Sequence, residues 1–101
     1  MNTILNQENL EKCQKVIEKY GFFPQTRQVA EECCELALAS LKMIRTQTPV
    51  VMKKHTPPLR NFREELVDVI VMATQAVMMT GITEDEINEM AAQKLDEALS
   101  E

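Results

Sequence analysis

Apolar residues recur three or four positions apart along nearly the whole chain, and the apolar–polar alternation typical of strands is absent. This spacing predicts an all-α fold. Gly21 and Gly81 are expected to end the first and third helices, and Thr83 is expected to cap the fourth, ahead of an acidic first turn. The segment 46–58 holds three prolines and is predicted to be the longest loop. The helices are predicted over residues 6–20, 25–45 and 58–80, and from Thr83 onward.

The third predicted helix is apolar on almost every face from Leu66 to Met79. A helix of this kind must be surrounded, and a chain of 101 residues buries only a limited core by itself. We therefore expect one domain over residues 1–101, a four-helix bundle completed by homo-oligomerisation as a homodimer or homotetramer.

Composition and charge narrow the class of protein. The chain is 45% hydrophobic and 27% charged, which is typical of a globular protein, and its net charge of −5 argues against binding to a nucleic acid polymer. An acidic protein can still bind a polyphosphate when metal cations bridge the two. The three cysteines do not resemble a disulfide framework, no secretory signal is evident, and the apolar run Val69–Met79 is too short to cross a membrane. We expect a soluble cytoplasmic protein.

Two pairs of acidic residues interrupt the apolar pattern, Glu32 with Glu35 and Glu65 with Asp68. Residues three apart project from one face of a helix, with Cβ atoms about 5–6 Å apart. If the second and third helices pack antiparallel, both pairs can converge on one point, where the carboxylates would repel one another unless they share a divalent cation. Ligands that are all oxygen suit Mg²⁺ or Mn²⁺ rather than Zn²⁺.

The alternative interpretation is a solvated acidic face, which is the usual reason for such spacing. Asp68 favours the metal site, because it stands between Val67 and Val69, where a buried, unpaired charge is costly. A ferritin-like di-iron site is disfavoured, because it needs Glu-x-x-His on two helices and the one histidine, His55, lies in the predicted loop. Cys33 and Cys34 are expected to be small core residues.

The segments "EECCEL" and "EELVD" resemble the EExxE…ExxD signature of the all-α nucleoside triphosphate pyrophosphohydrolases, the MazG-like superfamily. The resemblance extends from about residue 21 to residue 94. It implies a Mg²⁺-dependent enzyme that cleaves between the α- and β-phosphates of a nucleotide and releases a monophosphate and pyrophosphate. It also implies that the metal lowers the pKa of a bound water for attack on phosphorus. The metal ligands and catalytic residues carried over by the resemblance are Glu32, Glu35, Glu65 and Asp68.

The resemblance also suggests residues that bind the substrate. Three cations are candidates for contacts with the phosphates, and each is otherwise an exposed surface charge: Lys42, Arg45 and Lys94. Gln25 and Asn61 are candidates for contacts with the base or sugar, and their alternative role is to cap helix ends. The loop residues Lys53, Lys54 and His55 are better interpreted as an exposed loop than as a lid. Glu31 and Glu64 are expected to be solvated.

Two features depart from the family pattern. The family often has Asn or Arg residues beyond the late lysine, whereas here the sequence continues as "KLDEALSE", so a residue that grips the triphosphate is either missing or supplied by another subunit. This favours, as one alternative, a non-catalytic helical dimerisation module. A phosphoribosyl-ATP pyrophosphohydrolase-like enzyme is a second alternative, although "VIVM" replaces its aromatic and histidine after the ExxD motif. No motif distinguishes one nucleobase from another.

Overall fold

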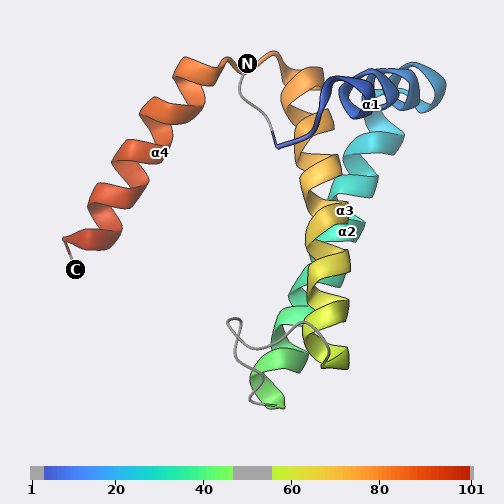
Figure 1. The fold of residues 1–101 in the computed structure, drawn as a ribbon. Coiled ribbons are helices and arrows are strands. Elements are labelled where there is room, and N and C mark those ends of the chain that lie inside the picture. Colours follow the sequence, from blue (N-terminus) through green and yellow to red (C-terminus); the bar gives the residue numbers. More distant parts are fainter. Residues whose placement is uncertain (1–3, 47–55, 101) are drawn as a thin grey trace.

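The computed structural model describes residues 4–46 and 56–100, and within these ranges it contains helices and no strand (Figure 1). The predicted all-α fold with four helices is confirmed. The helices are α1 (Gln7–Tyr20), α2 (Phe22–Arg45), α3 (Pro57–Thr80) and α4 (Glu84–Leu99).

Helix α2 begins three residues earlier than the sequence predicts. One residue, Gly21, separates it from α1, and the φ of 89° and ψ of 172° at Gly21 are a combination open essentially to glycine alone. Pro24 is accommodated in the first turn of α2, because the backbone N–H that proline lacks has no partner within a helix at that position. The six-residue connector predicted before Gln25 was therefore wrong, since Phe22 and Phe23 are helical.

The other predicted helix ends agree with the structure to within one residue. Asn6 caps α1 by accepting a hydrogen bond from the backbone N–H of Asn9. Gly81 ends α3 in the left-handed conformation, with a φ of 72°. Thr83 and Glu86 form a reciprocal capping box at the start of α4, so local sequence signals fix this boundary.

Helices α2 and α3 lie side by side along their lengths and run in opposite directions, while α1 packs beside both near one end (Figure 1). The apolar core that they enclose is small. Within the described ranges, the buried apolar residues are Cys13, Ala39, Met43, Leu59 and Met72. A larger number of big apolar side chains stays exposed, so much of the chain's apolar surface is not covered within one molecule.

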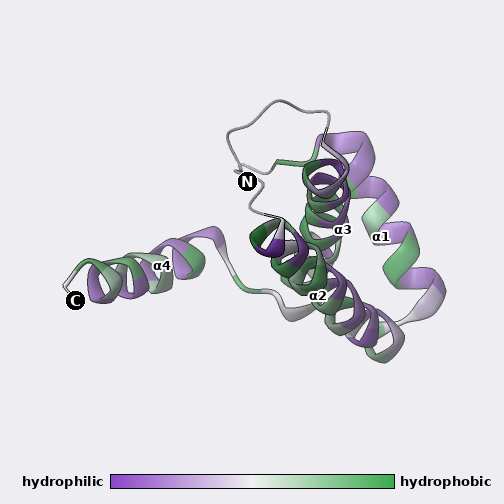
Figure 2. Ribbon diagram, turned by 90° about the horizontal axis from the view of Figure 1, so that it is seen from below, coloured by the Kyte–Doolittle hydropathy of each residue, from purple (hydrophilic) through white to green (hydrophobic). Residues whose placement is uncertain are grey.

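Helix α4 contacts none of the other three helices and projects away from them (Figures 1 and 2). A four-helix bundle is therefore not formed within the single chain, because the segment after Gly81 directs α4 away from α3. No single helix of the described chain is long and apolar enough to cross a membrane. Helices α3 and α4 reach the required length and hydropathy only as a pair bent by 118°.

Candidate metal centre

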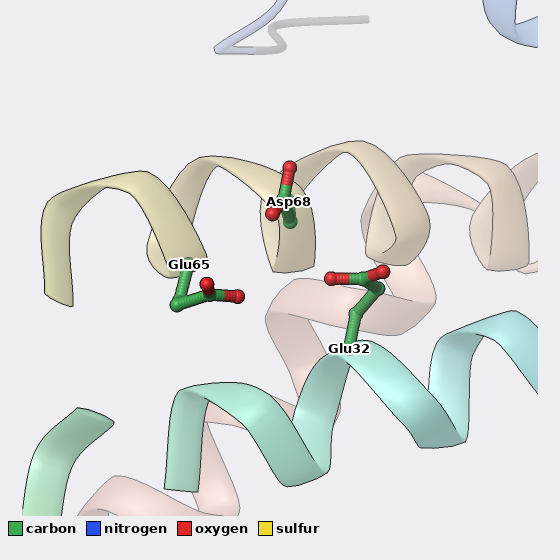
Figure 3. A group of neighbouring side chains, drawn as sticks. All are labelled: Glu32, Glu65 and Asp68. Carbon is green, nitrogen blue, oxygen red and sulfur yellow. The ribbon is translucent and has the colours of Figure 1, made fainter. Parts of the chain in front are cut away.

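The antiparallel contact of α2 and α3 brings together three carboxylates from the two predicted acidic pairs. Glu32 points from α2 toward α3, and Glu65 and Asp68 lie one turn apart on α3 (Figure 3). One oxygen from each of the three lies within 4.8 Å of the other two. The predicted convergence of the two helices on one acidic site is therefore present for these three residues.

Two of the three carboxylates are partly withdrawn from water. Glu32 and Glu65 are half-buried, and the Oε2 atom of each is buried without a hydrogen-bond partner. The other oxygen of Glu32 accepts a hydrogen bond of 3.0 Å from the side chain of Gln28, one turn earlier on α2. A buried carboxylate oxygen without a partner is costly, so each Oε2 atom is an acceptor that a bound cation would satisfy.

Asp68 differs from its expected environment. The sequence predicts that it is the most buried of the acidic residues, and this was wrong, because Asp68 is exposed. Its neighbours Val67 and Val69 are exposed and half-buried, since α3 is covered by α2 and α1 but not on its remaining side. An apolar sequence around an acidic residue therefore did not imply burial here.

Glu35 lies outside the group of three and is exposed, but it is close to Glu65. The pKa of Glu65 is raised above its ordinary value of 4.5, first by burial and then by a hydrogen-bonding contact with Glu35. The negative charges of Glu35, Asp68 and Glu32 raise it further. Glu65 is therefore the carboxylate on which the repulsion within this group is concentrated.

The donor atoms of the group fit a hard divalent cation. All are carboxylate oxygens, which Mg²⁺ and Mn²⁺ prefer and which are not the usual set for Zn²⁺. Two oxygens on one Mg²⁺ are at most about 4.2 Å apart, since each Mg–O distance is about 2.1 Å. The observed spacing of 4.8 Å is within a side-chain adjustment of that value. Glu32, Glu65 and Asp68 would hold the ion, with Glu35 adjacent.

The predicted substrate-binding residues have different surroundings. Gln25 is buried, and its Nε2 atom donates a hydrogen bond of 2.7 Å to Oε1 of Gln75, so this amide is committed to the interior. Asn61 is half-buried on α3, one turn before Glu65 and not at the helix end that it was expected to cap. Lys42 is exposed, two turns after Glu35 on α2, and therefore on the same side of that helix.

The remaining predicted residues lie elsewhere. Arg45 is exposed at the last position of α2, and Lys94 is exposed on α4, which does not approach the acidic group of its own chain. Glu31 and Glu64 are exposed, as expected. The predicted loop residues fall outside the described ranges: Lys53, Lys54 and His55.

Cys33 and Cys34 were expected in the core and are exposed, so that prediction was wrong. They lie on the side of α2 turned away from Ala39 and Met43, which face α3. The sequence did not distinguish the two sides, because α2 carries apolar residues on both.

Sequence reasoning missed two residues of the site's surroundings. Gln28 holds Glu32 by a hydrogen bond, and its position four residues before Glu32 was the signal that could have identified it. Gln75 holds Gln25, and its signal was a polar residue inside an apolar run. No family model, curated protein or solved structure matches this chain.

Proposed function

We propose that the protein is a Mg²⁺-dependent nucleoside triphosphate pyrophosphohydrolase of the MazG-like all-α superfamily. It would hydrolyse the bond between the α- and β-phosphates and release a nucleoside monophosphate and pyrophosphate. The observation that carries this proposal is the convergence of Glu32, Glu65 and Asp68 within 4.8 Å, with two buried oxygens that lack partners. These are the residues at which the EExxE…ExxD resemblance expects the metal ligands.

A cation bound at this site would neutralise the triphosphate and activate water for attack on phosphorus. The chain's own residues provide the remaining functions. Gln28 fixes the orientation of Glu32 through its 3.0 Å hydrogen bond. Lys42, on the same side of α2 as Glu35, is placed to contact the phosphates and offset the charge of the departing pyrophosphate.

An open groove beside the acidic group is a candidate site for the nucleoside. It lies between α1, α2 and α3, and its lining includes Tyr20, Gln25, Gln28 and Gln75. Gln28 links the groove to the acidic group, because it lines the groove and also donates to Glu32. A nucleoside bound there would present its phosphates toward the carboxylates.

The extent of exposed apolar surface supports an assembly of several copies. In the described ranges five apolar residues are buried, while thirteen large apolar side chains are exposed. We infer a homodimer or homotetramer, as the apolar sequence of α3 also indicates.

The decisive experiment is a panel of nucleoside triphosphates incubated with Mg²⁺ or Mn²⁺, with pyrophosphate and orthophosphate measured separately. We expect pyrophosphate and monophosphate as the primary products. Glu65→Gln and Glu32→Gln should abolish product formation, whereas the adjacent exposed residues supply matched controls in Glu64→Gln and Glu31→Gln. Orthophosphate as the primary product, or equal activity of all four variants, would refute the proposal. Metal binding without any product would favour the non-catalytic dimerisation module.

A further inference from the structure

Helix α4 carries an apolar face that nothing covers in the single chain (Figure 2). Ile87, Met90, Leu95 and Leu99 are 37%, 51%, 62% and 84% exposed. Ile87, Met90 and Leu95 recur at helical spacing, so they lie on one side of α4. The aliphatic stem of Lys94 extends the same side. An isolated helix of 16 residues is marginally stable in water, so its apolar face calls for a partner surface.

A second uncovered apolar surface lies on α2, opposite the side that packs against α3. It consists of exposed residues at helical spacing, which we name the outer stripe: Ala30, Cys34, Ala37, Leu38, Leu41 and Ile44. Leu38, Leu41 and Ile44 are 66%, 55% and 71% exposed, although Ala39 and Met43 on the other side are buried. Helix α2 is thus apolar on two sides, and one of them is unoccupied.

The charges at the ends of these two surfaces are complementary. The first turn of α4 holds Glu84, Asp85 and Glu86, and the last turn of α2 holds Lys42 and Arg45. None of these cations forms an ion pair in the described chain, where the one ion pair joins Lys12 to Glu8. Antiparallel packing of α4 on α2 would bring the acidic and basic turns together and would also align the helix dipoles favourably.

We propose that α4 of one protomer packs antiparallel on the outer stripe of a second copy of the chain, and that the second copy returns its own α4 in the same way. With Glu84 level with Arg45, the common rise of about 1.5 Å per residue sets Leu95 level with Cys34. Ile87 then lies level with Leu41. The apolar residues of the two surfaces therefore coincide in the register that the charges select.

This arrangement requires a second copy because of the reach of the chain. Helix α4 begins at the end of the molecule where α2 begins (Figure 1), whereas Arg45 lies at the opposite end of α2. The 24 residues of α2 span about 36 Å. The connection of three residues, 81–83, spans about 10 Å at most. Helix α4 can therefore lie along its own α2 only in the parallel direction.

Disulfide trapping in the full-length chain tests the register. In a Cys33→Ser background, which leaves the exposed Cys34 and the buried Cys13, the antiparallel register pairs Cys34 with Leu95→Cys of the other copy. Parallel packing within one chain would pair Cys34 with Ala91→Cys instead. After mild oxidation, non-reducing electrophoresis and peptide mapping would identify the disulfide, and Cys33→Ser alone supplies the background of dimers through Cys34.

The expected result is a covalent dimer from Leu95→Cys well above that background, and none above background from Ala91→Cys. An internal disulfide in Ala91→Cys, or no product above background from either variant, would overturn the proposal. Equal dimer formation by both variants would also overturn it, because the register would then be absent.

Sedimentation of uncoupled chains gives an independent test. Leu41→Gln is expected to weaken self-association at least tenfold, while Tyr20→Gln, at a residue of similar exposure outside the outer stripe, should leave it unchanged. Wild-type protein that sediments as a monomer at high concentration would contradict the proposal. Both tests use protein without metal or nucleotide, so their outcome is separate from that of the proposed hydrolysis.

Discussion

Gln25 on α2 and Gln75 on α3, fifty residues apart in sequence, share a buried hydrogen bond of 2.7 Å between Nε2 and Oε1. This pair has the same register as the acidic group. Glu32 follows Gln25 by seven residues, and Asp68 precedes Gln75 by seven, so on antiparallel helices the two pairs lie two turns apart, about 10 Å. The buried amide pair therefore helps to hold the alignment that brings Glu32 level with Asp68.

Replacing one partner of the amide pair should destabilise the fold. Gln75→Leu leaves the buried amide of Gln25 without its partner, which costs about 1–3 kcal/mol. The double variant Gln25→Leu with Gln75→Leu should recover part of this loss, because neither amide is then buried alone. Urea denaturation measures each free energy of unfolding, with the exposed Gln14→Leu as the control. Additive losses in the double variant would contradict this account of the pair.

Mg²⁺ or Mn²⁺ should stabilise the folded protein, because the buried oxygens of Glu32 and Glu65 gain a partner that the unfolded chain does not organise. A ligand at one hundred times its dissociation constant contributes about 2.7 kcal/mol. The melting temperature should therefore rise with metal concentration, and this rise should vanish in Asp68→Asn and Glu32→Gln. Glu31→Gln should keep it, since Glu31 is outside the group. A rise of equal size in all these variants would indicate binding elsewhere.

The metal-free protein should become less stable as pH rises through the titration of Glu65. The pKa of this group is higher in the folded protein than its ordinary value of 4.5, so the folded state binds its proton more tightly. Stability is therefore lost from about that value upward, until the group is ionised in the folded protein too. Glu65→Gln should remove this loss and raise the melting temperature at pH 7 without metal. Melting curves between pH 4 and pH 8 would show it, and a destabilised variant at pH 7 would contradict it.

The two glycines with positive φ should respond differently to substitution. An added Cβ meets no atom within 4 Å at either position, so the cost comes from the backbone alone. Gly81 is in the left-handed helical region, where Asn is tolerated, so Gly81→Asn should lose less stability than Gly81→Ala, which costs about 1–2 kcal/mol. Gly21, with a ψ of 172°, lies outside that region, so Gly21→Asn should give no such rescue. Urea midpoints of the four variants would test this contrast.

The fold class and most helix ends could be predicted because their causes are local. The spacing of apolar residues, the glycine at position 81 and the Thr83–Glu86 capping box act within a few residues. The start of α2 was missed because proline was taken to open the helix, whereas it is equally compatible with the two helical residues that precede it. Three of the four acidic residues could be predicted to meet, because helical spacing and an antiparallel pair suffice for that.

The sequence by itself therefore determined an all-α chain with four helices and the side of each helix on which its acidic residues lie. Only the tertiary structure decided which of these residues are withdrawn from water, because burial depends on what covers a helix and not on its own neighbours in sequence. For this reason Asp68 is exposed, whereas Glu32 and Glu65 each bury an oxygen between α2 and α3. The tertiary structure also left α4 unpacked, since an apolar face specifies that a helix needs a partner but not which surface supplies it.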